Sequence, residues 1–394
     1  MRYRYAVLGA GRQGQAAAFD LAVRGEAAGV VLFDADEGRA HRAAERVNRL
    51  AGRTVASAAG LDVRNREQLL SQLEGFDAAL SAVPYHFNAF ITEAAVRAGT
   101  PLCDLGGNTG VVFRQREFDT EARARGIAVV PDCGLAPGTA NVLAVYAIRR
   151  LEREGLRPEG VKIYCGGLPR RPRGPLDYQL VFSVEGLLNE YLSPAYVLRD
   201  GRVQTVEALT ELEELELPGV GRCEAFITSG GTSTAPWEYQ SKLKSYEYKT
   251  VRYPGHCAKI RLLRDLGLLE GEARAVVAQA LERTLDFGEP DLVVLRVVCS
   301  GSDGEREGSV QLDLWDVQDE ATGFTAMERT TGFSAAIVLH QLARGEVAPG
   351  VRTPDWAVDP EVYVNELLKR GFRLTETVRR PLALRREPES KSEP

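Results

Sequence analysis

The nine residues AVLGAGRQG, Ala6 to Gly14, decide the fold that this sequence predicts. They place Gly9, Gly11 and Gly14 in a GxGxxG pattern, directly after an apolar run typical of a strand and at the start of an amphipathic segment typical of a helix. Small residues let a backbone approach a pyrophosphate, and the N–H groups at a helix start attract its charge. The pattern therefore favours a dinucleotide site over the alternative, glycines that only allow tight packing of the helix on the strand.

A carboxylate at the end of the next apolar run indicates which dinucleotide is bound. Asp34, in LFDAD, lies twenty residues after Gly14. Such a carboxylate accepts hydrogen bonds from both ribose hydroxyls of the adenosine and repels a 2′-phosphate. Arg39 is near but belongs to the following helix, so NAD is favoured over NADP as the cofactor. Two later strand ends, LDVRN and SAVPYHFN, are expected near adenine and nicotinamide, and the predicted cofactor-binding residues are Gly9, Gly11, Arg12, Gln13, Gly14, Asp34, Asp62, Ala82, Val83 and Pro84.

Two sequence patterns follow each other along the chain. From Tyr5 to about Val130, apolar runs alternate with helical patterns, which predicts a parallel sheet covered on both faces. From about Gly160 the runs favour strands without regular crossovers, among them FTAMERTT at 324–331, with helices over 256–268 and 272–285. The predicted fold class is therefore α/β: a Rossmann-type doubly wound parallel sheet plus a second α+β domain with a mostly antiparallel sheet.

These sequence patterns divide the chain into four predicted parts. Residues 1–135 form the NAD-binding Rossmann domain, and residues 136–334 form the α+β domain. Residues 335–380 form a set of C-terminal helices that return to the first domain, and these helices start within the apolar segment TTGFSAAIVLHQLARG. The charged, Pro- and Ser-containing residues 381–394 are expected to be a disordered tail.

Composition excludes several classes of function. The chain has 394 residues, a formal net charge of -6 and six scattered cysteines with no CxxC pair. Mild acidity gives no basic surface for nucleic acid or an anionic membrane, and the cysteine spacing predicts no metal site. No apolar run approaches the length of a membrane span or a signal segment. We therefore expect reduced thiols in a cytoplasmic protein.

Beyond the nucleotide motif, a series of motifs resembles a known family. In chain order, GAGRQG with Asp34, CDLGGN, PDCGLAPGTAN, YCGGLP, FSVEGLL, SGGTST and KTVRYPGH are similar to the saccharopine dehydrogenase-like reductases over roughly residues 4–375, and most similar to their L-lysine 6-dehydrogenase branch. The resemblance implies a second domain that binds substrate and mediates a homodimer. It also implies NAD-dependent oxidation of the lysine ε-amine, in lysine degradation, to 2-aminoadipate 6-semialdehyde and ammonia.

One position departs from the wider family. In its saccharopine-forming members an arginine that grips a dicarboxylate stands at the place of Glu185 in FSVEG. A carboxylate there suits an ammonium group, which favours free lysine. Two alternatives stay open: saccharopine or a carboxylated polyamine as substrate, and a non-catalytic NAD-binding sensor.

Oxidation of an amine requires that the amine first lose a proton, so four catalytic candidates are considered. Asp104, at a strand end, could hold or deprotonate the amine, or could only cap the Gly-Gly turn. His86 could lie by the nicotinamide or face solvent at a helix start. Glu185 could bind an ammonium or only favour its helix N-terminus, and Lys249 could be a base or a surface charge on a strand.

The stretch EYKTVRYPGH is the predicted anchor for the α-carboxylate of a basic amino-acid substrate. Arg252 offers a bidentate fork, and it shares a strand face with Thr250. His256 begins the next helix and adds donors, although an interface or hinge role is the alternative. The loop SGGTST, with Thr232, Ser233 and Thr234, is expected to complete this grip or to close over the site.

Overall fold

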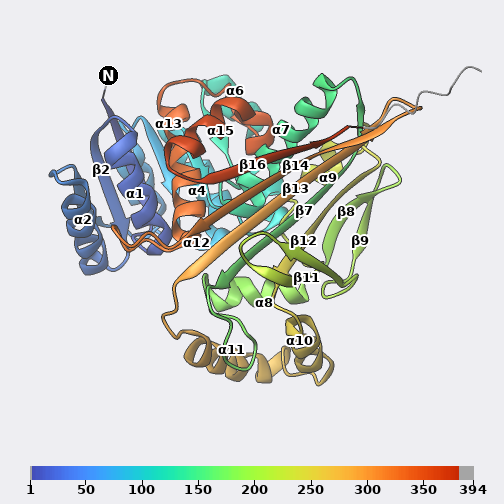
Figure 1. Cartoon of the computed structure of the whole chain (residues 1–394). Helices are drawn as coiled ribbons and strands as arrows, with labels where there is room; N and C mark the ends of the chain where they lie inside the picture. The colour runs from blue at the N-terminus through green and yellow to red at the C-terminus, as the bar shows by residue number, and fades with distance from the viewer. Residues whose placement is uncertain (1, 381–394) are drawn as a thin grey trace, which may run out of the picture.

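The computed structural model describes residues 2–380, which form two sheets with helices around them (Figure 1). The first sheet, sheet A, has seven parallel strands in the order β15-β6-β5-β4-β1-β2-β3. Its strands are β1 (Tyr3–Leu8), β2 (Ala27–Asp34), β3 (Ala56–Gly60), β4 (Ala78–Ser81), β5 (Leu102–Asp104), β6 (Ala128–Val130) and β15 (Gly350–Val351). The order reverses between β1 and β4, and this reversal opens a binding crevice at the carboxyl ends of the strands.

Alternation along the strands explains why both faces of sheet A are covered. Tyr5 and Val7 of β1 are buried in one apolar cluster, and Ala6 and Leu8 are buried in another. The first face packs against α1 (Arg12–Arg24), α2 (Glu37–Ala51) and α13 (Ser334–Ala343), and the second against α3 (Arg66–Leu73), α4 (Asn88–Ala98) and α6 (Asp119–Arg125). The predicted doubly wound Rossmann-type sheet is confirmed.

The second sheet, sheet B, is mixed and mostly antiparallel, as predicted. Its main order is β10-β11-β12-β7-β13-β14-β16, with β8 beside β12 and β9 beside β8. Among its described strands, only β7 and β12 pair in parallel. The strands are β7 (Arg157–Pro169), β8 (Ala195–Arg199), β9 (Arg202–Val206), β10 (Glu213–Leu217), β11 (Gly221–Ile227), β12 (Ser245–Arg252), β13 (Asp291–Ser302), β14 (Glu307–Val317) and β16 (Arg373–Arg379).

Helices cover sheet B on one side and at one end. The long helix α7 (Ala140–Arg153) packs on β7, β13 and β14. Figure 1 shows α8 (Val184–Leu192), α10 (His256–Asp265) and α11 (Gly271–Leu285) grouped at one end of the long strands. The helices predicted at 256–268 and 272–285 correspond to α10 and α11.

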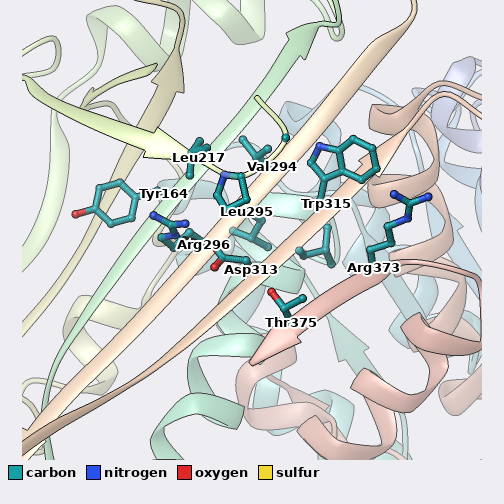
Figure 2. A pocket seen from close by; sticks show the side chains of 12 residues that line it. Tyr164, Leu217, Val294, Leu295, Arg296, Asp313, Trp315, Arg373 and Thr375 are labelled. Carbon is teal, nitrogen blue, oxygen red and sulfur yellow. Dashed lines mark hydrogen bonds and ion pairs between the residues drawn. The ribbon is translucent and has the colours of Figure 1, made fainter. Parts of the chain in front are cut away.

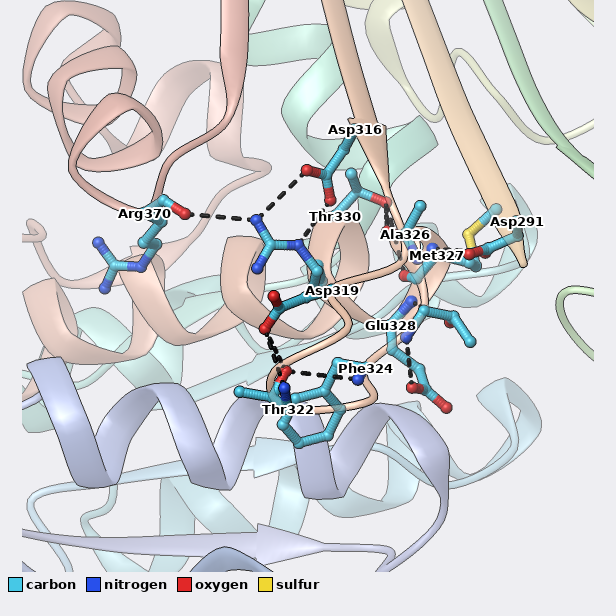
Figure 3. A network of polar contacts seen from close by, with 12 residues as sticks. Asp291, Asp316, Asp319, Thr322, Phe324, Ala326, Met327, Glu328, Thr330 and Arg370 are labelled. Carbon is cyan, nitrogen blue, oxygen red and sulfur yellow. Dashed lines mark hydrogen bonds and ion pairs between the residues drawn. The ribbon is translucent and has the colours of Figure 1, made fainter. Parts of the chain in front are cut away.

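The segment predicted as the strand FTAMERTT is helical instead. It forms α12 (Ala326–Glu328), followed by the helical turn η3 (Arg329–Phe333). Thr325 and Glu328 make a capping box, and the Asp291 carboxylate accepts hydrogen bonds from Ala326 N at 2.6 Å and Met327 N at 3.0 Å (Figure 3). These caps satisfy the first N–H groups of a helix, which residue alternation alone could not reveal.

The C-terminal part differs from the predicted set of helices. Helices α13, α14 (Pro354–Ala357) and α15 (Pro360–Lys369) are present, but β15 joins sheet A and β16 pairs with β14 in sheet B. A buried ion pair between Arg370 and Asp20, at 2.7 Å, ties this segment to α1. The predicted tail, 381–394, lies outside the described residues. Within residues 2–380, every helix is too short or too polar to span a bilayer.

Candidate functional site

The loop between β1 and α1 has the shape that a pyrophosphate requires. Gly9 has a φ of +101°, and a Cβ there would lie 2.6 Å from Ala82 O. A Cβ on Gly14 would lie 1.9 Å from Gly9 O, so both positions require glycine. A Cβ on Gly11, by contrast, would meet no atom within 4 Å, and this residue begins α1 without a side-chain cap. The loop therefore leaves open space beside uncapped N–H groups, which fits a dinucleotide phosphate.

Arg12 and Gln13 follow in the first turn of α1, and their side chains contact α12. Arg12 Nε donates to Glu328 Oε1 at 2.7 Å, and Gln13 Nε2 lies 3.5 Å from Met327 O. Their backbone N–H groups remain at the helix start. Their predicted role in binding the cofactor stays a prediction.

Asp34 lies at the carboxyl end of β2, where the cofactor ribose is expected. Its Oδ2 accepts from Ala10 N at 3.0 Å, and its Oδ1 accepts from Asp36 N at 2.9 Å. The Arg39 guanidinium approaches it to 3.8 Å. Two backbone hydrogen bonds therefore hold the carboxylate in place next to the glycine loop.

The other predicted cofactor positions are also at strand ends. Ala82 contacts Gly9, so the Ala82–Pro84 segment lies against the glycine loop after β4. Asp62 follows β3 and forms an ion pair with Arg64 at 2.6 Å, which lowers the pKa of the exposed Asp62 carboxyl to about 2. Its predicted place beside adenine stays a prediction.

Two buried carboxyls meet where β5 and β6 end. Asp104 Oδ1 accepts from Gly106 N at 2.7 Å and Asp132 N at 3.1 Å, and its Oδ2 accepts from Gln115 Nε2 at 2.7 Å. Burial raises the pKa of Asp104. These bonds match the structural alternative, in which Asp104 caps the Gly-Gly turn; its role toward an amine stays a prediction.

Asp132 was missed by the sequence reasoning, although VVPD is a strand end like PLCD. It has a φ of +64°, and burial together with the nearby Asp104 raises its pKa to about 8. Its Oδ2 accepts a hydrogen bond from Ser233, which belongs to the SGGTST loop of the second domain. Among the residues that the structure describes, its buried Oδ1 has no hydrogen-bond partner. The two domains are therefore joined at this carboxyl.

The neighbouring threonines of the SGGTST loop are also engaged. Thr232 Oγ1 donates to Tyr196 O at 3.1 Å, and Thr234 hydrogen-bonds Glu238 and the Arg116 guanidinium of the first domain. In the structure these hydroxyls hold the loop against both domains. Their predicted contact with substrate is untested.

Arg252 is buried on β12 at the start of a hydrogen-bonded chain. Its Nε donates to Tyr191 Oη at 3.0 Å, and that hydroxyl donates to His256 Nε2 at 2.9 Å. His256 Nδ1 donates to Leu176 O at 3.0 Å. Burial, with the charge of Arg252, lowers the pKa of His256 to about 3, so the ring is neutral and positions Tyr191.

Glu190 of α8 is the acid that faces this guanidinium, and the sequence reasoning did not identify it. Its Oε2 lies 3.7 Å from Arg252 Nη2. Burial raises the pKa of Glu190 to about 7, against the lowering effect of Arg252. An acid that titrates near neutrality is suited to hold an ammonium or move a proton.

The remaining predicted residues lie apart from this cluster. Lys249 points to the opposite face of β12, where it pairs with Glu213 at 2.8 Å, because neighbouring strand residues alternate. Glu185 is 65% exposed and pairs with Arg274 at 2.8 Å. His86 is exposed and its ring contacts Phe87 in a tilted arrangement, with ring centroids 4.1 Å apart. The structure therefore does not gather the four predicted catalytic side chains at one point.

Tyr85, beside His86, connects the segment after β4 to the second domain. It follows the Ala82–Pro84 segment, and its hydroxyl accepts from Asn189 Nδ2 at 3.2 Å. Asn189 directly precedes Glu190 on α8. The wall that carries Glu190 and Arg252 therefore faces the crevice at the end of β4.

A cavity of about 270 Å³ lies elsewhere, on the face of sheet B opposite α7 (Figure 2). Its lining includes Tyr164, Arg296, Asp313, Trp315 and Arg373. Tyr164 pairs with Lys249 across the strands, so the cavity lies on the face of sheet B opposite Arg252 and does not belong to the Arg252–Glu190 cluster. Over residues 2–380 no three His, Cys, Asp or Glu side chains are grouped to hold a metal ion.

Comparison with known proteins adds an independent observation. The family models described as saccharopine dehydrogenase NADP binding domain and saccharopine dehydrogenase C-terminal domain match residues 5–130 and 134–372. The NADP(+), L-glutamate-forming saccharopine dehydrogenase of Saccharomyces cerevisiae is 26% identical over 237 residues, which are 59% of this chain and 52% of that protein. The mitochondrial alpha-aminoadipic semialdehyde synthase of Rattus norvegicus is 26% identical over 216 residues, 53% of this chain and 23% of that protein. The matched part thus spans about half of the yeast relative and less of the rat one.

Two solved structures share the fold. The apo form of the L-Glu-forming saccharopine dehydrogenase from Saccharomyces cerevisiae has a TM-score of 0.79 at 20% identity, covering 95% of this chain and 99% of the other. A homospermidine synthase from Legionella pneumophila, in complex with NAD, has a TM-score of 0.71 at 13% identity, covering 99% and 94%. At these identities the likeness concerns the fold.

Proposed function

The chain belongs to the saccharopine dehydrogenase family, and from this premise we propose that it oxidises the ε-amine of L-lysine with NAD. The family comprises oxidoreductases that act on the CH–NH groups of amino acids, which gives the reaction class. The products of the proposed reaction are 2-aminoadipate 6-semialdehyde and ammonia. NAD supplies the hydride acceptor when bound.

The residues of this chain would bind the cofactor and the substrate at separate places. The glycine loop and the start of α1 hold the pyrophosphate, and Asp34 receives the ribose hydroxyls. Arg252 holds the α-carboxylate of the substrate. The ε-amine must lose a proton before its carbon loses hydride, and water then adds to the resulting imine and displaces ammonia. Since that amine has an ordinary pKa of about 10.4, activity is expected to rise toward alkaline pH.

The observation that carries the proposal is the charge balance of the second-domain wall. It offers one buried guanidinium, Arg252, with the carboxyl of Glu190 beside it. Lysine carries one carboxylate and two ammonium groups, so this balance suits it. Saccharopine carries three carboxylates, and this wall offers a single guanidinium, so two carboxylates would have no cationic partner there. A carboxylate placed 4 Å from an acid would cost about 4 kcal/mol at an effective dielectric of 20.

Saccharopine remains the second candidate because of one specific contact. Arg274 of α11 lies within 2.8 Å of Glu185 and 3.2 Å of Asn189 Oδ1. It therefore brings a guanidinium next to the position where an acid alone was expected. If Glu185 turned away, Arg274 could hold a second carboxylate.

One assay separates the candidates. The purified chain is incubated with NAD and with L-lysine, saccharopine or a carboxylated polyamine in turn, and formation of reduced nicotinamide is followed by absorbance. We expect turnover of lysine well above that of the other two. Greater turnover of saccharopine would reject the proposal, and cofactor binding without turnover of any substrate would favour the sensor.

NAD is the proposed nucleotide, although the yeast relative and the matching family model are named for NADP. The support is Asp34, whose carboxylate is held at the β2 end where a 2′-phosphate would lie. The proposed compartment is the cytoplasm, with which the six buried, unpaired cysteines agree.

A homodimer is the proposed assembly. The proposed occupant of the face of sheet B that no helix of residues 2–380 covers is a second copy of the chain. That face holds the cavity of about 270 Å³ beside half-buried Tyr164 and Trp315. In the described part of the chain, the buried Trp315 Nε1 has no acceptor. Light scattering should give twice the chain mass, and Trp315→Arg should give monomer; a monomeric parent protein would reject the assembly.

A further inference from the structure

The guanidinium of Arg252 keeps one nitrogen available. Its Nη1 donates to Val251 O at 2.9 Å, its Nε is bonded to Tyr191, and the Tyr178 ring lies 4.6 Å from its central carbon. Within residues 2–380, Nη2 makes no hydrogen bond, and the acid that faces it is Glu190 at 3.7 Å. The side chain of Arg252 is 3% exposed, so this free nitrogen lies at the closed end of the site.

The carboxylate of Glu190 is likewise uncommitted. No N–H or O–H group of the described residues donates a hydrogen bond to it, since Ser229 N bonds only to its backbone oxygen. Its side chain is 27% exposed, against 3% for Arg252. The carboxylate therefore stands nearer to the opening, with the guanidinium behind it. A distance of 3.7 Å is too long for a hydrogen bond, so the two groups attract each other without satisfying each other.

Their surroundings make this pair part of the crevice and not of the outer surface. Glu190 follows Asn189, which contacts Tyr85 next to the end of β4. Tyr191, on the other side of Glu190, orients Arg252 and is itself fixed by the neutral ring of His256. One turn of α8 thus supplies the link to the first domain, the acid and the support of the guanidinium.

A cation and an anion side by side match the head group of a free α-amino acid. We propose that Arg252 binds the α-carboxylate and Glu190 the α-ammonium of the substrate, so that the pair selects α-amino acids and directs the distal amine toward the nicotinamide. This inference rests on the proposed function and specifies how the same site chooses its substrate. The α-carboxylate and the α-ammonium of the substrate each gain a charge-assisted hydrogen bond. In exchange, the weak contact between Arg252 and Glu190 is lost.

Truncated substrates test the assignment. The probes are L-lysine, 6-aminohexanoate, which lacks the α-amine, and 1,5-diaminopentane, which lacks the carboxylate. The parent protein should oxidise L-lysine with a kcat/KM at least tenfold above that for either truncated compound. In Glu190→Gln, which keeps the shape of the side chain, lysine should lose at least tenfold through KM, while 6-aminohexanoate should stay within about threefold. The matched control, Glu214→Gln, changes a carboxylate that is 73% exposed on β10 and should behave as the parent.

An equal loss for lysine and 6-aminohexanoate in Glu190→Gln would overturn the inference, because it would place the acid at the distal amine or in the structure of the site. A binding experiment keeps this result separate from the proposed function. L-2-Aminohexanoate has the same head group and no distal amine, so it cannot be oxidised at that end. In the presence of NAD it should raise the Tm of the parent and of Glu214→Gln but not of Glu190→Gln, whether or not lysine is the physiological substrate. No shift in the parent would reject the head-group pair.

Discussion

The choice between the two nicotinamide dinucleotides can be predicted from Asp34. Its two backbone hydrogen bonds, from Ala10 N at 3.0 Å and Asp36 N at 2.9 Å, prevent the carboxylate from turning away when a 2′-phosphate approaches. Like charges about 4 Å apart cost about 4 kcal/mol at an effective dielectric of 20. Arg39, at 3.8 Å and 55% exposed, can move toward the phosphate and offset much of this cost. We therefore expect a net preference for NAD of at least about 1.4 kcal/mol, which is tenfold.

Two substitutions separate the charge of Asp34 from its hydrogen bonds. Asp34→Asn keeps an acceptor for Ala10 N and removes the charge, whereas Asp34→Ala removes both. Both should narrow the preference, because Arg39 then faces the 2′-phosphate without a competing carboxylate. The assay is a fluorescence titration with NADH and NADPH, which yields two Kd values without any assumption about substrate. Equal Kd values for the parent protein would refute the reasoning, as would an unchanged ratio in Asp34→Asn.

Three further predictions concern the loop, the anchor and the domain contact. Gly11→Ala should keep the parent Tm but weaken NADH binding at least tenfold, because its Cβ enters the space for the pyrophosphate. Gly14→Ala should lower the Tm, because its Cβ would lie 1.9 Å from a backbone oxygen. Equal changes in Tm and NADH binding for the two variants would contradict this prediction. Arg252→Lys should raise the KM for lysine about 10- to 100-fold and leave the Kd for NADH unchanged. The reason is that a point charge replaces a bidentate guanidinium–carboxylate contact worth about 1.5–3 kcal/mol. Parent-like kinetics would place the arginine outside the substrate site. Asp132 has a folded-state pKa of about 8, above its ordinary value, so the folded chain keeps a proton that the unfolded chain releases, and this contribution to stability is lost as pH rises from about 4 to 8. Between pH 5 and pH 8 the free energy of unfolding of Asp132→Asn should therefore rise relative to that of the parent, by up to about 1.4 kcal/mol per pH unit. The Tm difference between the two proteins should grow over the same range, and parallel Tm profiles would contradict the prediction.

Features that depend on neighbours in the sequence were predictable. The GxGxxG spacing and the regular alternation of strand and helix specify sheet A, because each βαβ unit is completed within a short stretch of chain. The same holds for strand faces: Thr250 contacts Thr228 at 2.7 Å on the side that also carries Arg252, and Lys249 lies on the other. The start of a helix at His256 was also local information.

The parts that were missed depend on contacts between distant segments. Glu190 has no sequence signature, because its partner Arg252 is brought to it only by the packing of α8 on β12. Asp132 gains its role from Ser233 in the other domain. The strand predicted over 324–331 failed for a related reason, since the carboxylate of Asp291 caps that segment as a helix from a different strand. The sequence shows where a carboxylate stands in the chain, but the group that it contacts is determined by the fold.

The return of the C-terminal segment to sheet A has a consequence for how the protein can be synthesised and cut. The edge strand β15 pairs with β6, α13 covers β4 and β5, and Arg370 neutralises the buried Asp20 of α1. A ribosome-bound chain that has emerged only as far as residue 135 lacks all three, so its nucleotide-binding half would expose an apolar sheet face and an uncompensated carboxylate. The first domain therefore cannot finish folding until the C-terminal segment has been synthesised, and a fragment of residues 1–135 should aggregate when expressed alone.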